Sequence, residues 1–417
     1  MNKKSIKDIE LKGKRVLMRV DFNVPMKDGV VGDDTRIRAA LPTIQHALQA
    51  GASVVLMSHS GRPKGKLEPK LSLKPAADRL SELLGAAVGF APDCIGQEAA
   101  AMAQALKPGQ AMLLENLRFH PEEEGKPDLP ADASDEDKKA AKAEMKKRQN
   151  VFAQRLAALG DVYVNDAFGT AHRAHASMVA VAGFFADRVA GLLMEKELTY
   201  MGGALEKPDR PFVAIIGGAK ISGKIDVITA LLDKVDAILI GGGMVYTFYK
   251  AMGLPIGQSL VEAEKVDVAR ETLEKIKAKG VKFLLPTDHI VADAFSAEAN
   301  VKTVGERGIE DGWMALDIGP QSVQTFCDEI RQARTVVWNG PMGCFEMGPF
   351  AEGTMTVTRC VAETDCVSIV GGGDSVSAVN KSGLADKFTH ISTGGGASLE
   401  FLEGKALPGV EALSDGA

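Results

Sequence analysis

The sequence Phe-Val-Ala-Ile-Ile-Gly-Gly-Ala-Lys (residues 212–220) decides the fold of the second half of the chain. Its five leading apolar residues indicate a strand that is buried on both faces, and glycines follow directly where the strand ends. Similar runs predict further strands at residues 237–240, 282–285, 335–338, 367–370 and 390–392. Because helical patterns lie between these runs, they predict a parallel sheet of the α/β class.

The first half of the chain shows the same alternation. Short β-branched runs predict strands at residues 15–22, 53–58, 111–115 and 162–165, and the patterns between them predict helices at residues 35–50, 71–84 and 135–159. Residues 187–208, between the two halves, are expected to form a helix that ends at Lys207-Pro208, which suits a stiff connector. We therefore expect two α/β domains joined by a hinge helix.

The composition excludes several classes of protein. With 417 residues, of which 45% are hydrophobic and 25% charged, the chain is neither disordered, collagen-like nor a disulfide scaffold. The net charge of −6 does not indicate a nucleic-acid partner, but it divides into +4 over residues 1–190 and −10 over residues 191–417. The acidic residues 122–137 and the Lys/Glu-rich residues 138–148 are expected to form a solvated surface insertion.

The five cysteines give no sign of a metal site or of cross-links. They are scattered, without a Cys-x-x-Cys pair or a histidine at ligand spacing, so neither a disulfide framework nor a zinc site is expected. This usage fits a reducing cytoplasm. No apolar run is long enough to cross a membrane or to act as an export signal, so we expect neither feature.

Glycine is abundant, with 44 residues, and much of it lies where the strands of the second half end. Ligands of open α/β sheets bind at the carboxyl ends of the strands, so runs such as Gly371-Gly372-Gly373-Asp374 favour a phosphate that approaches the backbone. Lys220 and Lys224 could bind such phosphates, and Asp374 could bind Mg²⁺. The lysines could also be solvated helix residues, and Asp374 could be a helix N-cap.

Two common nucleotide signatures are not matched. Residues 218–225 nearly fit the phosphate loop G-x-x-x-x-G-K-[ST], but Ile225 replaces the hydroxyl residue that would hold Mg²⁺. The dinucleotide fingerprint G-x-G-x-x-G after the first strand is absent as well, which removes support for hydride chemistry.

Charged side chains, rather than glycines, follow the strands of the first half. Together with Arg36 at a helix start, residues 21–25, 59–62, 116–118 and 166–175 bring four arginines and up to three histidines to one edge. Guanidinium groups match carboxylate and phosphate in bidentate geometry, so we expect a small, strongly anionic ligand there. Asp21 and Asn23 would then bond a hydroxyl of that ligand.

At these residues the sequence resembles the phosphoglycerate kinase family. Eight motifs follow in order over essentially the whole chain: Arg-Val-Asp-Phe-Asn-Val-Pro (19–25), Ser-His-Ser-Gly-Arg-Pro (58–63), Glu-Asn-Leu-Arg-Phe (115–119), Asp-Ala-Phe-Gly-Thr-Ala-His-Arg (166–173), Gly-Gly-Ala-Lys (217–220), Trp-Asn-Gly-Pro (338–341), Gly-Gly-Gly-Asp (371–374) and Ser-Thr-Gly-Gly-Gly (392–396). The resemblance implies reversible, Mg²⁺-dependent transfer of the acyl phosphate of 1,3-bisphosphoglycerate to ADP, giving 3-phosphoglycerate and ATP in glycolysis.

The family also implies the organisation of the chain. Two Rossmann-like domains are expected: residues 1–186 bind phosphoglycerate, and residues 209–401 bind the nucleotide. Residues 187–208 form the hinge helix, and the tail at residues 402–417 packs back on the first domain. The family further implies a cytoplasmic monomer that acts on neither nucleic acid nor membrane.

The site residues implied by the resemblance fall into two sets. Those expected to bind phosphoglycerate are Asp21, Phe22, Asn23, Arg36, His59, Ser60, Gly61, Arg62, Arg118 and Arg173. Those expected to bind the nucleotide are Lys220, Lys224, Gly242, Asn339, Glu346, Gly372, Gly373, Asp374 and Ser375, with Asp374 also the metal ligand and Glu346 at the ribose. Arg36, Lys220 and Gly373 are expected to be catalytic.

The sequence departs from the family pattern at three places. Ser60 stands where the family usually has Leu, which could alter local packing, and Ser375 stands where it usually has Thr, which keeps the hydroxyl. An insertion covers residues 126–149, outside the motifs.

No general base is expected. The attacking carboxylate is already ionised at pH 7, so His59, His172 and His175 are expected to serve as hydrogen-bonding or structural groups. Two alternatives remain on sequence grounds alone. One is another α/β phosphotransferase acting on a different carboxylate; the other is a nucleotide-binding protein without catalysis.

Overall fold

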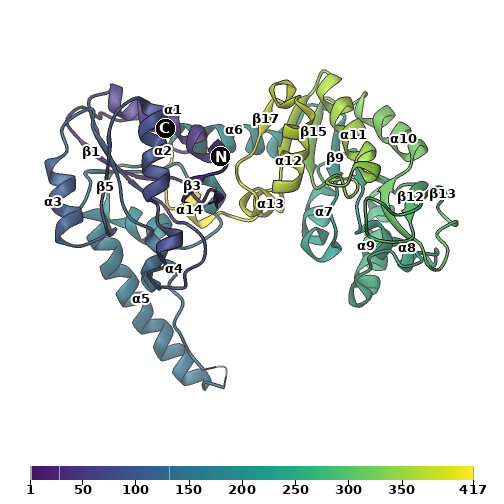
Figure 1. The fold of residues 1–417 in the computed structure, drawn as a ribbon, viewed down its shortest axis with the longest axis horizontal. Helices are drawn as coiled ribbons and strands as arrows, with labels where there is room; N and C mark the ends of the chain where they lie inside the picture. The colour runs from purple at the N-terminus through teal and green to yellow at the C-terminus, as the bar shows by residue number, and fades with distance from the viewer. Residues whose placement is uncertain (1, 28, 131, 417) are drawn as a thin grey trace. The chain divides into compact units, whose positions relative to one another are not determined.

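The computed structural model describes residues 2–27, 29–130 and 132–416 of the chain. They form two compact units, one running to Thr199 and including the segment from Ala406 onward, the other covering Tyr200–Lys405. The division falls inside helix α6 (Leu192–Glu206), which is coloured teal in Figure 1. Among the described residues, no helix is long and apolar enough to cross a membrane.

The first unit contains a six-stranded parallel sheet. Its order is β5 (Val88–Phe90), β6 (Ala111–Leu113), β4 (Ser53–Met57), β1 (Arg15–Arg19), β7 (Val162–Asn165) and β8 (Arg188–Ala190). The helices α1 (Thr35–Gln49) and α2 (Lys74–Leu84) bury their apolar sides against alternate residues of these strands, such as Val16, Met18, Val54 and Leu56. α3 (Gln97–Ala105) and α5 (Asp135–Ala157) complete the larger helices of this unit.

The second unit contains another six-stranded parallel sheet. Its order is β11 (Lys282–Leu284), β10 (Ala237–Ile240), β9 (Phe212–Ile216), β15 (Thr335–Asn339), β16 (Val367–Gly371) and β17 (His390–Ile391). Numbered along the chain, these strands follow the order 3-2-1-4-5-6 of dinucleotide-binding folds. The two parallel sheets confirm the expected fold class.

The helices of the second unit cover both faces of its sheet. They are α7 (Ile225–Leu231), α8 (Val245–Ala251), α9 (Val266–Lys279), α10 (Pro320–Ile330), α11 (Glu352–Glu363), α12 (Gly373–Ser382) and α13 (Gly396–Leu402). One core combines α10, α11 and α12 with one face of the sheet around the buried Trp338. The strand order reverses direction between β9 and β15, so the loops after these two strands flank the place where such folds bind ligands.

The structure corrects the expected connector helix. Residues Arg188–Ala190 do not begin a helix; they form β8, which pairs with β7, and Val189 is fully buried there. Helix α6 starts only at Leu192, where Asp166 Oδ1 accepts hydrogen bonds from the backbone N–H groups of Leu193 and Met194 at 2.9 and 3.1 Å. The three-residue strand was missed because a single buried valine gives no periodic pattern.

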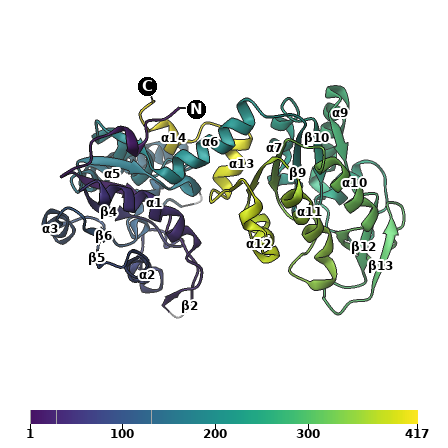
Figure 2. The same ribbon diagram turned by 90° about the horizontal axis from the view of Figure 1, so that it is seen from above.

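A small antiparallel sheet was also missed. It consists of β12 (Asp288–Ala292), β13 (Val301–Gly305) and β14 (Met314–Ile318), with β12 in the centre. It lies against α10 and α11, as Figure 2 shows. β13 is an edge strand whose residues alternate between exposed and half-buried, so it lacks the continuous apolar run by which the parallel strands are recognised.

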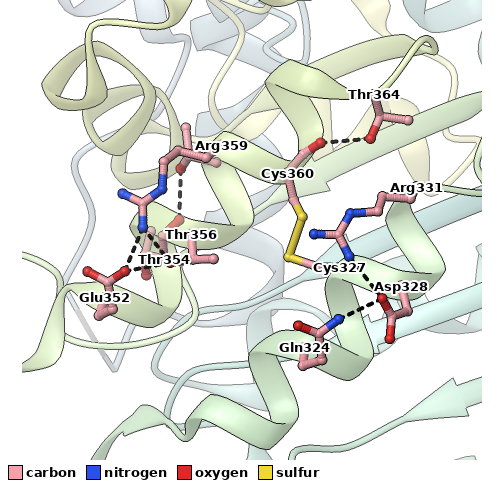
Figure 3. The surroundings of a disulfide bond; sticks show 11 residues. Gln324, Cys327, Asp328, Arg331, Glu352, Thr354, Thr356, Arg359, Cys360 and Thr364 are labelled. Carbon is pink, nitrogen blue, oxygen red and sulfur yellow. Dashed lines mark hydrogen bonds and ion pairs between the residues drawn. A yellow bond between two sulfur atoms is a disulfide. The ribbon is translucent and has the colours of Figure 1, made fainter.

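The structure pairs two of the five cysteines, against expectation. Cys327 on α10 and Cys360 on α11 form a disulfide, with their Cα atoms 5.8 Å apart (Figure 3). Both side chains are buried where the two helices pack, so the pair depends on tertiary packing and not on sequence spacing. Cys94, Cys344 and Cys366 are free thiols.

The acidic and Lys/Glu-rich insertion lengthens a helix instead of forming a separate element. Ser134 caps α5 by accepting from Asp137 N at 3.1 Å, and three acidic residues follow in its first turn, where the helix dipole favours them. The first turns of α5 are largely exposed, and the helix extends away from the sheet of its own unit (Figure 1). Burial begins at Met145, so only the second half of the helix contacts the core.

Candidate active site

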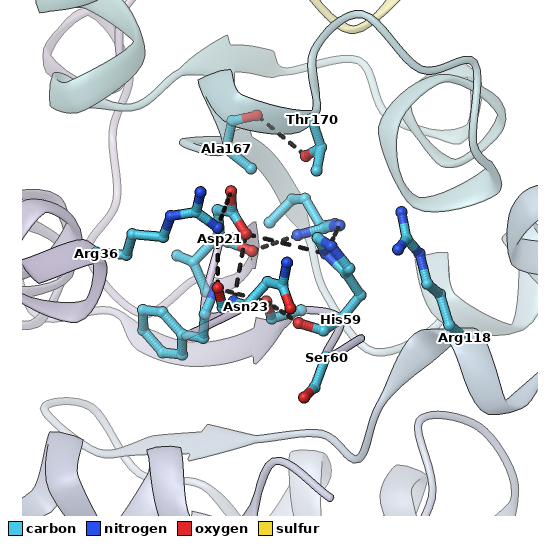
Figure 4. Close-up of polar contacts among 12 residues, drawn as sticks. Asp21, Asn23, Arg36, His59, Ser60, Arg118, Ala167 and Thr170 are labelled. Atoms are coloured by element: carbon cyan, nitrogen blue, oxygen red, sulfur yellow. Dashed lines mark hydrogen bonds and ion pairs between the residues drawn. The ribbon is translucent and has the colours of Figure 1, made fainter. Parts of the chain in front are cut away.

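The carboxyl edge of the first sheet brings a cation, a carboxylate and an amide together. Arg36, the second residue of α1, donates through Nη1 to the Asn23 carbonyl oxygen at 2.9 Å and lies 3.4 Å from Asp21 Oδ2. Asn23 Oδ1 in turn accepts from the Gly61 backbone N–H at 2.9 Å. Figure 4 shows Arg36 and Arg118 on opposite sides of Asp21, Asn23 and His59.

His59 is held neutral by its surroundings. Its side chain is buried, and Nδ1 lies 3.1 Å from Arg19 Nη2. A guanidinium can only donate, so Nδ1 accepts and the proton of the neutral ring is on Nε2. Burial, together with the nearby charges of Arg19 and Arg118, holds the pKa of His59 well below its usual range. His59 is therefore a hydrogen-bonding group at neutral pH and not a cation.

Arg118 has unused hydrogen-bonding capacity inside the protein. Its Nη1 donates to the Gly61 carbonyl oxygen at 2.8 Å, and its Nε lies 3.8 Å from Glu124 Oε1. Among the described residues no acceptor hydrogen-bonds this buried Nε. Burial also lowers the pKa of Arg118, although the group stays charged. A buried guanidinium with a free donor is the kind of group that an anionic ligand satisfies.

The loop that carries Ser60 is fixed by Asn116. The Ser60 backbone N–H donates to Asn116 Oδ1 at 3.1 Å, and the Ser60 carbonyl accepts from Asn116 Nδ2 at 2.7 Å. The side chain of Ser60 is buried and points away from Asp21 and His59 (Figure 4). Phe22 is fully buried, and its backbone N–H donates to Ser58 Oγ at 2.8 Å, so Phe22 positions the loop between Asp21 and Asn23.

Arg62 and Arg173 differ from the other two arginines. Both side chains are exposed, and neither has an ion-pair partner within the part of the chain that the structure describes. They stand at the ends of two different loops of the first unit, one after β4 and one after β7. Their charges are therefore available to a ligand at this edge without first breaking an internal pair.

A buried polar network behind this edge was missed by the sequence analysis. Arg19, fully buried at the end of β1, donates to the Val20 carbonyl oxygen and to Ser177 Oγ, the latter at 2.9 Å. Ser177 Oγ donates to Glu123 Oε1 at 2.6 Å, and Glu123 is also fully buried. Glu123 Oε1 lies 3.7 Å from Nδ1 of His175, whose pKa falls to about 3 through burial and nearby arginines. The sequence contains one signal for this network, namely that Arg19 is a charged residue within a largely apolar strand.

The glycine loops of the second unit pack directly on one another. A Cβ on Gly217 would lie 2.1 Å from the Pro341 carbonyl oxygen, and one on Gly340 would lie 2.1 Å from the Gly217 carbonyl oxygen. A Cβ on Gly242, which has φ +71°, would lie 2.5 Å from the Gly218 carbonyl oxygen. At Gly217, Gly242 and Gly340 the close approach of two backbones is thus the physical reason for glycine.

At the start of α12, Gly373 leaves the edge open. A Cβ on Gly373, the first residue of α12, would meet no atom within 4 Å. Gly372, the N-cap of α12, has φ +89°, and its Cβ position lies 3.1 Å from Asn339 Oδ1. Asp374 is exposed in the first turn of α12, and none of the described basic side chains forms an ion pair with it. The start of α12 therefore offers backbone N–H groups to an anion.

Lys224 is the most perturbed cation of the second edge. Its Nζ donates to Asn339 Oδ1, and burial lowers its pKa to about 8, although the nearby Asp374 opposes this shift. Asn339 is itself buried, and its Nδ2 has no hydrogen-bond partner among the described residues. A phosphate at this place would satisfy both groups.

Of the remaining residues that we expect to bind the nucleotide, two are exposed and one is buried. Lys220 and Glu346 are exposed, with Lys220 at the start of the short 3-10 helix Ile221–Gly223. Ser375 is fully buried, and its Oγ accepts from the Gly340 backbone N–H at 2.5 Å. The hydroxyl of Ser375 thus fastens the start of α12 to the loop after β15.

The comparisons with known proteins agree over the whole chain. The family model described as phosphoglycerate kinase matches residues 6–405. The phosphoglycerate kinase of Chloroherpeton thalassium is 57% identical over 418 residues, with 100% of both chains covered. Among solved structures, the phosphoglycerate kinase of Coxiella burnetii has a TM-score of 0.85 at 41% identity, covering 98% of each chain. That of Pyrococcus horikoshii has a TM-score of 0.83 at 33% identity, again with 98% covered. The chain therefore belongs to the phosphoglycerate kinase family.

Proposed function

We propose that the edge of the first unit binds 3-phosphoglycerate or 1,3-bisphosphoglycerate, and that the edge of the second unit binds ATP or ADP. The kinase activity itself, with its place in glycolysis, follows from membership of the family. The observation that carries the assignment of the first edge is the buried Arg118, whose Nε lacks a hydrogen-bond acceptor among the described residues. A phosphate or carboxylate oxygen is the acceptor that such a group requires.

At the first edge, the four arginines together neutralise the negative charge of the acid. The side chains of Arg62 and Arg173 are exposed, whereas Arg118 donates to the Gly61 carbonyl oxygen. We therefore assign Arg62 and Arg173 to the phosphate on carbon 3 of the substrate, away from the reacting carboxyl group. Asp21 and Asn23 bond the substrate hydroxyl. Arg36 is proposed to stabilise the transferring phosphoryl group, because it is the cation whose guanidinium lies beside Asp21 and Asn23.

No proton has to be abstracted in this reaction. The carboxylate of 3-phosphoglycerate is ionised at neutral pH, since carboxyl groups have reference pKa values near 4. The neutral state of His59 and the low pKa of His175 agree with a role in hydrogen bonding rather than in base catalysis. The protein thus contributes alignment of the reacting oxygens and neutralisation of charge.

At the second edge, backbone groups are proposed to bind the nucleotide phosphates. The open side of Gly373 admits a phosphate to the N–H groups of α12, while Lys220 and Lys224 supply positive charge. Gly242, Asn339 and Ser375 act by holding the loops in place, and the exposed Glu346 is proposed to accept the ribose hydroxyls.

The residues present fit a bound Mg²⁺. Asp374 offers an exposed carboxylate beside the proposed phosphate site, and hard oxygen ligands of this kind suit Mg²⁺, which takes its remaining ligands from phosphates and water. When bound, the ion neutralises charge on the nucleotide phosphates. Lys220 would act on the transferring group independently of the metal.

Three further features belong to the proposal. Closure about helix α6, inside which the two units divide, would bring the two ligands together and exclude water that could hydrolyse the acyl phosphate. The active form is proposed to be a monomer, and its place the cytoplasm.

The direct test is a coupled assay of ATP consumption with 3-phosphoglycerate and Mg²⁺. Turnover is expected with this acid and not with a panel of other small carboxylic acids. Turnover with another acid but not with 3-phosphoglycerate would refute the substrate assignment, and no turnover with any acid would refute the catalytic one.

A further inference from the structure

Three potential metal ligands meet at the outer end of the first sheet. Asp93 and Cys94 lie in the loop after β5, and His120 lies in the segment after β6, between a 3-10 helix (Leu117–Phe119) and α4 (Pro121–Glu124). β5 and β6 pair in parallel, with Phe90 opposite Leu113, so both loops leave the sheet at the same edge. One ligand atom from each of the three residues lies within 4.8 Å of the others.

The carboxylate of Asp93 connects the other two residues of the cluster. His120 Nε2 lies 2.6 Å from Asp93 Oδ1, which also accepts from the Cys94 backbone N–H at 2.6 Å. The ring of His120 packs on Phe152 of α5, with centroids 5.3 Å apart, which limits its rotation. The imidazole is therefore held by a carboxylate on one side and by an aromatic ring from another element.

The three side chains of the cluster are buried to different degrees. The Cys94 side chain is fully buried, whereas the side chains of His120 and Asp93 are 26% and 49% exposed. Cys94 thus lies at the base, and the two exposed ligands leave a path for an ion from solvent. The same burial argues against a Cys-His-Asp nucleophile, because a substrate could not reach a sulfur that has no exposed surface.

We propose that Asp93, Cys94 and His120 form a binding site for a thiophilic divalent cation, with Zn²⁺ the ion that the ligands suit best. Sulfur and imidazole nitrogen select Zn²⁺ over Mg²⁺ or Ca²⁺, and three protein ligands leave the fourth tetrahedral position to water. Nothing in the proposed kinase reaction uses this cluster.

The protons and charges of the three ligands can be accounted for when a divalent cation binds. The Cys94 thiol loses its proton to solvent as the sulfur–metal bond forms. The hydrogen bond between His120 Nε2 and Asp93 Oδ1 breaks, so that Nε2 binds the metal while the ring carries its proton on Nδ1. One thiolate and one carboxylate then neutralise the two charges of the cation. Zn–S and Zn–N bonds of ordinary length separate sulfur and nitrogen by about 3.5 Å, and the three ligand atoms lie within 4.8 Å of one another. His120 Nε2 and Asp93 Oδ1, which are 2.6 Å apart without the ion, must separate so that both can bind it. The partly exposed Asp93 and His120 can supply this movement.

The test uses untagged full-length protein, freed of metal with a chelator and exchanged into buffer without thiol reagents. Co²⁺ serves as the probe, because a cobalt–thiolate bond gives a charge-transfer band in the near ultraviolet. The band is expected to saturate at one equivalent of Co²⁺ and to disappear when Zn²⁺ is added. Absence of the band in the wild-type protein would overturn the proposal.

Matched variants identify the ligands. Cys94→Ser should remove the band, whereas Cys366→Ser, which alters a half-buried free thiol in the other unit, should leave it intact. A band that persists in Cys94→Ser would contradict the assignment. Because the buried Cys94 also affects packing, His120→Asn gives a second test at a partly exposed position. It should weaken Zn²⁺ binding by about 100-fold or more, measured by competition with a chromophoric chelator; unchanged affinity would rule out His120 as a ligand.

Discussion

The carboxyl edges of the two sheets are built in opposite ways. In the first unit, the edge consists of side chains, and a buried network of Arg19, Ser177 and Glu123 lies behind it. In the second unit, loops that touch backbone to backbone at Gly217, Gly242 and Gly340 form the edge, with few side chains between them. We therefore propose that the same parallel topology serves recognition by guanidinium groups in one unit and by backbone N–H groups in the other.

The largest effect is expected at Arg36. Arg36→Ala should lower kcat by about a thousandfold or more, as loss of a cation that stabilises a transferring phosphoryl group does. ADP affinity, measured by calorimetry, should stay nearly unchanged, because Arg36 belongs to the first unit. Arg38→Ala is the control, since Arg38 is an exposed residue of the same helix that pairs with Asp34 at 2.8 Å. Equal losses in both variants would remove Arg36 from the mechanism.

The next effect separates two kinds of glycine in the second unit. Gly217→Ala should lower the free energy of unfolding by about 3 kcal/mol or more, because its methyl group would meet the Pro341 carbonyl oxygen at 2.1 Å. Gly373→Ala should leave stability nearly unchanged, because its methyl group would meet no atom. Denaturant titrations of both variants measure the difference, and similar stabilities would mean that the loops do not depend on this contact.

The buried network of the first unit should respond to loss of its cation. Arg19→Met removes the guanidinium that bonds Ser177 and His59, and leaves Glu123 buried with its charge. We expect a loss of about 3 kcal/mol in the free energy of unfolding. The double variant Arg19→Met/Glu123→Gln should recover part of it, because the uncompensated charge is then gone. No recovery would show that the two groups do not act as a pair.

The smallest effect is a dependence of ADP affinity on pH. Lys224 has a pKa of about 8 in the free protein, and a bound phosphate favours its charged form and raises that pKa. Affinity should therefore be full below pH 8 and fall as pH rises above it, by at most tenfold per pH unit. Lys224→Arg, which keeps its charge, should show no such fall. Calorimetry across this range would contradict the role of Lys224 if the wild-type affinity stayed constant.

The sequence predicted the parts of the fold that carry a continuous signal. The runs at residues 162–165, 212–216 and 237–240 coincide with β7, β9 and β10, because unbroken apolar strands belong to buried parallel sheets. The short strands β5 and β8 and the exposed β13 carry no such run. The candidate site residues were proposed because most of them follow a strand, and parallel strands bring their carboxyl ends to one edge.

Contacts between distant segments could not be predicted in the same way. The disulfide of Cys327 with Cys360 depends on how α10 and α11 pack, and the cluster around Cys94 depends on β5, which the sequence did not indicate. The glycines at residues 217, 242 and 340 were attributed to a ligand, whereas the structure shows that neighbouring loops already require them. In each case the partner is another part of the chain, which a pattern within one segment cannot reveal.

The first edge is proposed to bind the acid and the second edge the nucleotide. Calorimetry of two variants tests this assignment most directly. Arg118→Met should abolish binding of 3-phosphoglycerate and leave ADP binding intact, because Arg118 lies in the first unit. Gly373→Ala should do the reverse, because a methyl group at the open start of α12 would hold phosphate away from the backbone. Loss of ADP binding in Arg118→Met, or of 3-phosphoglycerate binding in Gly373→Ala, would contradict the account.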